Sequence, residues 1–160
     1  FIHKNMVVYR ITQEQYAHDL SGNGAKLYGG RWNNEGMPAL YTAGSRALAL
    51  LETLAHTPIH LLSVKKYVVL AIEIPEHVTY ERISLKKLKP DWDAWDLQFY
   101  TQKIGDAFLK ANQHLIMEVP SVLLHEENNY IINPLHKDFV KVKIVDEKEL
   151  KFNDRLLKAM

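Results

Sequence analysis

The chain has 160 residues, a length typical of one domain. Its 20 Lys and Arg residues almost balance its 19 Asp and Glu residues, and the formal net charge of +1 argues against a domain that coats nucleic acid. The absence of cysteine excludes a disulfide scaffold, a thiolate zinc site and a cysteine nucleophile. No apolar run approaches the ~20 residues that span a bilayer, so no membrane partner is expected.

The N-terminal part contains a strand pattern at residues 7–11, which are β-branched or aromatic except for Arg10. Because Met6 directly precedes this pattern, we assign the domain to residues 6–160. Residues 1–5 are interpreted as a non-native or disordered N-terminal segment. Thr12 can cap a helix, and Gln15 stands where a capping box needs it, so a short helix is predicted over residues 13–20.

A polar, glycine-rich segment follows. Five of the seven glycines lie between Gly22 and Gly36. So much backbone freedom in one place predicts a tightly turned loop, or a backbone that approaches a ligand closely.

The next two elements are a strand at residues 39–43 and a helix that Ser45 caps and that runs to about His56, before Pro58. Apolar residues cover every face of this helix, which predicts that it is buried. Glu52 is its only acid. A carboxylate in a buried helix must be paired, neutral or directed into a cleft, so Glu52 is the most informative single residue in the chain.

Beyond Pro58, helical and strand patterns mix without a regular βα alternation, which predicts one compact α+β domain. The patterns are strands at residues 66–74, 78–83, 130–132 and 139–145, a helix at residues 93–112, an apolar run at residues 116–124, and a charged, helical or irregular end after residue 145.

Two familiar chemistries fit the chain poorly. His56 and His60 are four residues apart, but Pro58 lies between them and no glutamate completes an H-E-x-x-H zinc site, so surface or capping histidines are expected and no metal site is predicted. Ser121 is not in a G-x-S-x-G elbow, and the residues alone favour a serine bonded to nearby backbone.

Nucleotide binding fits better, although no standard phosphate-loop motif is present. Gly29, Gly30 and Arg31 can present backbone N–H groups and a guanidinium to a pyrophosphate, and an arginine on a surface turn explains them equally well. Aromatic residues lie close to Arg10 and Arg31 in the sequence and suit stacking on a base or a nicotinamide ring. These residues are Tyr9, Tyr28, Trp32 and Tyr41. Taken alone, Tyr9 and Tyr41 are better explained as ordinary strand residues.

Taken as an ordered set, these segments resemble the RES-domain family, which is named after an arginine, a glutamate and a serine. The matching stretches are Tyr9-Arg10, residues 24–33 (GAKLYGGRWN), residues 39–43 (ALYTA), Leu50-Leu51-Glu52, Val119-Pro120-Ser121 and residues 129–136 (NYIINPLH). The resemblance covers residues 6–145 and places the family's arginine at Arg10 or Arg31, its glutamate at Glu52 and its serine at Ser121.

The resemblance implies a bacterial, cytoplasmic toxin of a RES–Xre toxin–antitoxin pair, with a mixed-sheet core like that of ADP-ribosyltransferases. It implies that NAD⁺ is a substrate rather than a cofactor, and that its nicotinamide–ribose bond is cleaved by hydrolysis or phosphorolysis. The implied partner is an Xre-like antitoxin that covers the active site, contacts DNA for the complex and forms higher oligomers with the toxin. Transfer of ADP-ribose to a host protein is the alternative, and a non-catalytic nucleotide-binding module is a further one.

The same resemblance suggests roles for the candidate residues. Arg31, Arg10, Glu52 and Ser121 are the expected catalytic set, with the arginines on the pyrophosphate and Glu52 beside the ribose. Ser121 is expected to bond the ribose or the carboxamide. The expected binding residues are Tyr28, Gly30, Trp32, Tyr41 and, as a supporting residue, Asn133.

Overall fold

Seven strands form one mixed sheet in the computed structural model, which describes residue 2 and residues 4–159. The strand order is β4-β5-β6-β2-β1-β3-β7. In chain order the elements are β1 (Met6–Gln13), α1 (Asn23–Tyr28), β2 (Leu40–Ala43), α2 (Arg46–His56), α3 (Ile59–Val64), β3 (Tyr67–Ile74), β4 (Tyr80–Arg82), α4 (Gln98–Ala111), β5 (Ile116–Pro120), β6 (Asn128–Ile132), β7 (Lys143–Leu150) and α5 (Asp154–Ala159). The predicted α+β class and single sheet-based domain are confirmed.

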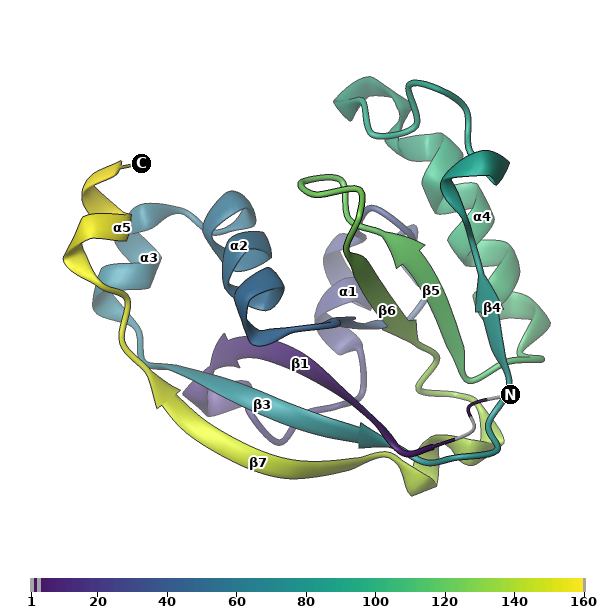
Figure 1. The fold of residues 1–160 in the computed structure, drawn as a ribbon, viewed down its shortest axis with the longest axis horizontal. Helices are drawn as coiled ribbons and strands as arrows, with labels where there is room; N and C mark the ends of the chain where they lie inside the picture. The colour runs from purple at the N-terminus through teal and green to yellow at the C-terminus, as the bar shows by residue number, and fades with distance from the viewer. Residues whose placement is uncertain (1, 3, 160) are drawn as a thin grey trace.

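The sheet is bent into two parts that run at a steep angle to each other (Figure 1). One part consists of β1, β3 and β7, which pair antiparallel. The other consists of β4, β5 and β6, in which β4 and β5 are parallel. Strand β2 joins the two parts by pairing with β1 and β6. Helix α2 lies over β1 and β2, and α4 lies beside β4 and β5, on the other side of the molecule (Figure 1).

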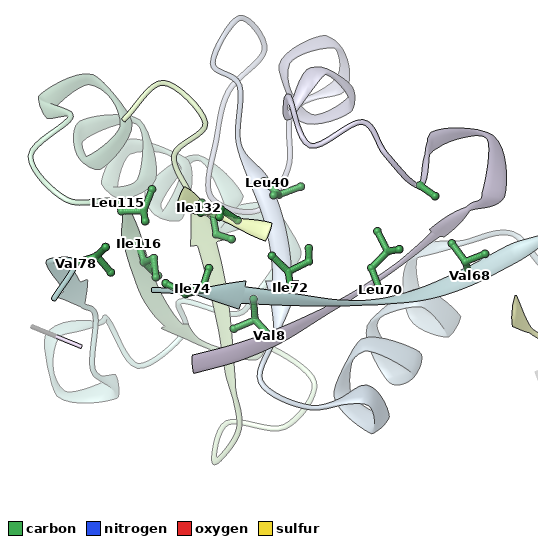
Figure 2. Packing of buried hydrophobic residues seen from close by; sticks show 12 residues of the cluster. Val8, Leu40, Val68, Leu70, Ile72, Ile74, Val78, Leu115, Ile116 and Ile132 are labelled. Carbon is green, nitrogen blue, oxygen red and sulfur yellow. The ribbon is translucent and has the colours of Figure 1, made fainter. Parts of the chain in front are cut away.

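The largest core cluster lies where the two parts of the sheet meet. Figure 2 shows that side chains from β1, β3, β5 and β6 gather there, among them Val8, Ile72, Ile116 and Ile132. A second cluster lies between β5, β6 and α4 and includes Trp32. The first cluster is built mainly from the apolar strand runs, and the second combines residues of β5 and β6 with Phe108 and Leu109 of α4 and two loop tryptophans, Trp32 and Trp92.

The predicted helix at residues 13–20 is wrong. Strand β1 continues to Gln13, which pairs with Tyr67 of β3, and only a short 3-10 turn follows at Glu14–Tyr16. The ladder to β3 supplies the backbone hydrogen bonds of this segment, and this tertiary pairing outweighs the local capping signal.

Helix α2 is less buried than its composition predicts. Ser45 caps it as expected, by accepting a hydrogen bond from Leu48 N. However, only Leu48 and Ala49 are buried, and Leu51 is 41% exposed. The helix packs on β1 and β2 through one face, which leaves Leu51 open to solvent.

The C-terminal strand is displaced from its predicted position. Residues Lys137–Lys141 form a 3-10 helix, and β7 begins at Lys143 and continues to Leu150. Its pairing with β3 determines this position, because Glu73 pairs with Lys143 and Tyr67 with Leu150.

The segment before β1 contacts the rest of the domain through two of its described residues, Ile2 and Asn5. Ile2 N donates to Val78 O at 3.0 Å, and Asn5 Oδ1 accepts from Glu76 N at 3.0 Å. Residues 1 and 3, part of the segment interpreted as non-native or disordered, lie outside the described residues. No helix among those that the structure describes is both long and apolar enough to cross a membrane.

Candidate active site

A cavity of about 540 Å³ lies between α2, α1 and the sheet, and its volume is in the range of small-molecule sites. Most of the residues predicted for the site line it. Those with charge are Arg10, Arg31 and Glu52; the others are Tyr28, Gly30, Trp32 and Tyr41. Among the described residues that line this cavity, Glu52 is the only carboxylate. The fold therefore brings β1, the glycine-rich segment, β2 and α2 to one place.

The carboxyl group of Glu52 is held by two side-chain donors on one oxygen. Ser121 Oγ donates to Oε1 at 2.7 Å, and Asn129 Nδ2 donates to the same oxygen at 2.7 Å. His56 Nδ1 lies 3.4 Å from Oε2. Two short bonds on one oxygen fix the orientation of the carboxyl group, which also reaches the cavity.

Ser121 lies behind Glu52 and is fully buried. Its Oγ accepts hydrogen bonds from Leu123 N at 3.1 Å and Leu124 N at 3.3 Å, which is the backbone bonding expected from the residues alone. Because a hydroxyl has one hydrogen, these two acceptor contacts leave that hydrogen for Glu52. Ser121 thus links the turn after β5 to the carboxyl group on α2.

Both candidate arginines reach the cavity. Arg10 Nη1 donates to Asp19 O at 2.9 Å, and Arg31 Nη1 donates to Ala94 O at 3.2 Å. Burial lowers the pKa of Arg10, an effect that the charge of Asp19 opposes. Burial likewise lowers the pKa of Arg31, against the charges of Asp93 and Glu52. Each guanidinium is partly desolvated and keeps further N–H donors for an anion.

A family model described as the RES domain matches residues 7–153. The chain belongs to the RES domain family. Its relatives include proteins named "Toxin Res" from Photorhabdus laumondii, 38% identical over 96% of this chain and 99% of the relative, and from Yersinia enterocolitica, 36% identical over 84% and 88%. Another, from a Sphingobium species, is named "Prs ADP-ribosylating toxin" and is 36% identical over 89% of each chain.

The fold of this RES domain also matches a solved structure. The crystal structure of the M. tuberculosis MbcT–MbcA toxin–antitoxin complex contains a chain that superposes with a TM-score of 0.77 and 20% identity, over 99% of this chain and 90% of that one. At this identity the likeness concerns the fold.

The glycine-rich segment of the RES domain is held from inside by Asn33. Its Nδ2 donates to Ala25 O at 2.8 Å and to Met37 O at 2.9 Å, and its Oδ1 accepts from Tyr41 Oη at 2.7 Å. Tyr41 Oη also accepts from Trp32 N at 3.0 Å. A Cβ at Gly30 would lie 2.7 Å from Tyr41 Oη, so any larger residue there must displace the hydroxyl that bonds Asn33 and Trp32.

Helix α4 holds the same segment from outside, which the sequence did not predict. Thr101 Oγ1 donates to Arg31 O at 2.6 Å, Gln102 Nε2 donates to Gly30 O at 2.9 Å, and Asp106 accepts from Asn34 N at 3.0 Å. Gln102 and Asp106 are four residues apart and share one face of the helix, and Thr101 is adjacent to Gln102. The signal that could have found them is weak, because polar residues on a helix face usually face solvent.

The predicted binding residues differ in their surroundings. Trp32 is buried and its ring centroid lies 6.0 Å from that of Trp92, whereas Tyr28 is 82% exposed at the edge of the cavity. Asn133 does not line the cavity: its Nδ2 donates to Asn112 Oδ1 at 2.9 Å, at the C-terminal end of α4. The structure therefore places Asn133 outside the cavity, and its supporting role stays a prediction.

Sequence reasoning missed His56, which lines the cavity and was expected to be a surface or capping histidine, and it also missed Asn129. Asn129 belongs to the 129–136 stretch that carried the resemblance, but nothing in that stretch indicates contact with Glu52 across 77 residues of chain. No cluster of three or more His, Cys, Asp or Glu side chains able to hold a metal occurs in the described part of the chain.

Proposed function

We propose that this RES domain is the toxin of a toxin–antitoxin pair and that it cleaves the nicotinamide–ribose bond of NAD⁺. One observation carries the proposal: a single carboxylate, fixed by Ser121 and Asn129, shares a cavity with two partly desolvated arginines. The names of the relatives support the toxin part, and the size and charge of the cavity support a dinucleotide.

For this reaction the protein must mainly position the substrate and stabilise the charge that develops. Cleavage of the bond from the ribose C1′ to nicotinamide passes through an oxocarbenium-like state, as glycoside hydrolysis does. The leaving group departs as neutral nicotinamide, so it needs no proton. A carboxylate held beside the ribose stabilises the developing positive charge, and we assign this role to Glu52.

The remaining cavity residues suit the rest of the substrate. Arg10 and Arg31 are assigned to the pyrophosphate, because a guanidinium binds phosphate oxygens through two parallel N–H donors. Tyr28, at the open edge, is assigned to stacking on a ring of the substrate. Ser121 is assigned to orienting Glu52 through their hydrogen bond.

The alternative acceptor is a protein side chain, which would make the enzyme an ADP-ribosyltransferase. The Sphingobium relative named an ADP-ribosylating toxin favours this second candidate. Both reactions release nicotinamide through the same bond cleavage. They differ only in what attacks C1′.

Incubation of the purified chain with NAD⁺ labelled in its adenine tests the proposal and separates the acceptors. We expect nicotinamide release, with the label in free ADP-ribose when water attacks and in a phosphorylated ADP-ribose when phosphate attacks. Label on protein from an added bacterial lysate would support transfer instead. Binding of NAD⁺ without nicotinamide release would refute the proposed cleavage and leave a binding module.

We propose that the partner is an Xre-like antitoxin, which covers the cavity and contacts DNA. Both proteins would act in the cytoplasm, where NAD⁺ is available. Arg31 donates a hydrogen bond to Ala94 O, and large apolar side chains are exposed directly after Ala94. Trp95 is 80% exposed, and Phe99 is exposed on the following turn. Exposed apolar groups of this size are typical of protein interfaces. Trp95→Glu is expected to weaken antitoxin binding, measured by calorimetry, without reducing nicotinamide release.

A further inference from the structure

We propose that His56 is a catalytic base that removes the proton from the attacking water through Nε2, while Glu52 stabilises the cation. This inference rests on the proposed cleavage of NAD⁺ and assigns a division of labour within the same cavity. A base is needed when the attacking group is a neutral O–H nucleophile such as water, and the proposal applies to that case.

The position of His56 on α2 supports this role. Ala49, Glu52, Thr53 and His56 all line the cavity, and their spacing of three and four residues places them along one stripe of the helix. Exposure increases along the stripe. Ala49 is buried, the Glu52 side chain is 20% exposed and the His56 side chain is 57% exposed. His56 therefore stands at the end of the stripe where water enters.

The hydrogen bonds of the ring determine which nitrogen is available. His56 Nδ1 lies 2.8 Å from the backbone carbonyl oxygen of Glu52. A carbonyl oxygen only accepts, so Nδ1 carries the hydrogen and donates it. In the neutral ring Nε2 then has the free electron pair, and no described residue bonds Nε2. The backbone of Glu52 thus sets the tautomer that a base needs.

Glu52 is less suited to receive the proton itself. Its Oε1 accepts from both Ser121 and Asn129, and its Oε2 faces the Nδ1–H side of His56 at 3.4 Å. Both oxygens therefore already face donors. The oxocarbenium-like state requires negative charge at this point. Glu52 therefore acts on the ribose cation, and His56 acts on the attacking water.

The step balances without any further reactant. The oxygen of water forms a bond to C1′ of the ribose, and the C1′–N bond breaks with its electron pair going to the nicotinamide nitrogen. The proton of the water goes to His56 Nε2, and the resulting imidazolium releases it to solvent. The products are ADP-ribose, neutral nicotinamide and one proton.

Three variants test the assignment in the full-length chain. His56→Asn retains an amide N–H close to the position of Nδ1 but has no base. His60→Asn is the matched control, because His60 is exposed on α3 and does not line the cavity. Nicotinamide release is measured with and without sodium azide, an anionic nucleophile that needs no base. Glu52→Gln is measured in the same way.

We expect His56→Asn to lower kcat for hydrolysis by about a hundredfold or more, with KM for NAD⁺ little changed, and azide to restore nicotinamide release. His60→Asn should match the wild type, and azide should not rescue Glu52→Gln. Wild-type rates in His56→Asn, or a low rate that azide does not raise, would overturn the role of His56 alone. Absence of NAD⁺ cleavage by the wild type would refute the proposed function as well.

Discussion

At the scale of single residues, the site depends on how one carboxyl group is oriented. Ser121 and Asn129 come from the turn after β5 and from β6, and both donate to Oε1 of Glu52 on α2. Glu52 itself was identifiable from the sequence, because an acid among apolar helical residues requires a partner. Its partners were not, since contacts across 69 and 77 residues depend on how the sheet closes.

Removing one of the two donors should reduce catalysis more than binding. Asn129→Ala is expected to lower kcat by about tenfold, because a hydrogen bond to a charged group is worth about 1.5–3 kcal/mol and Ser121 still holds the carboxylate. KM for NAD⁺ should change little. Steady-state nicotinamide release measures both. Asn128→Ala, the adjacent position on the opposite face of β6, is the control, and equal kcat values for the two variants would contradict the role of Asn129.

Tyr41 should contribute to stability in a way that depends on pH. Its hydroxyl bonds Asn33 and Trp32, and burial strongly raises its pKa above the ordinary value. A raised pKa means that the folded state keeps the proton up to a higher pH than the unfolded chain does. The stabilisation is therefore complete below about pH 10, where the unfolded tyrosine titrates, and is lost as the pH rises further.

Tyr41→Phe tests this contribution. At neutral pH we expect the variant to lose about 1–3 kcal/mol of unfolding free energy, because Asn33 and the Trp32 N–H lose a buried partner. Above pH 10 the wild type should lose stability more steeply than the variant. Urea unfolding at several pH values measures both effects, and parallel pH profiles for the two proteins would argue against the role of Tyr41.

At the scale of elements, local patterns predicted most strands but not where β1 ends or where β7 begins. Strands β1, β2 and β3 follow from β-branched and aromatic runs, and α2 follows from its Ser45 cap. The helix predicted at residues 13–20 and the strand predicted at 139–145 failed because pairing with β3 decides where β1 ends and where β7 begins. Such pairing joins distant segments and leaves no local signal.

The contact between α4 and the glycine-rich segment gives a prediction at this scale. A Cβ at Gly105 would lie 1.6 Å from Trp32 O, so Gly105→Ala must push α4 away from the backbone that carries Arg31. We expect a loss of about 1–3 kcal/mol or more in stability, together with a lower affinity for NAD⁺. Thermal unfolding and NAD⁺ titration measure these effects.

Gly24 provides the matched control for the stability effect of this substitution. It lies in α1, and a Cβ there would meet nothing within 4 Å. Gly24→Ala should leave the stability unchanged or raise it by up to about 1 kcal/mol, since alanine is the better helix former. Equal effects of the two alanines on the unfolding temperature would contradict the close packing of α4.

At the scale of the whole molecule, the near-zero net charge hides a local separation. Arg10 and Arg31 line the cavity together with one carboxylate, Glu52, while Asp19 and Asp93 act on the two guanidinium groups from outside the lining. Composition excluded several classes of protein, and the ordered set of motifs indicated the RES domain family, which the family match confirms. The geometry of the cavity could not be predicted, because it requires the bend that brings α2 close to β6.

The most direct test of the account compares nicotinamide release from NAD⁺ by the wild type, Glu52→Gln and Glu35→Gln. Glu35 is exposed in the glycine-rich segment and does not line the cavity, so it controls for the loss of one negative charge. We predict that Glu52→Gln lowers kcat by about a hundredfold or more while the unfolding temperature is maintained, and that Glu35→Gln behaves as the wild type. Equal rates for Glu52→Gln and the wild type would contradict the central role of this carboxylate.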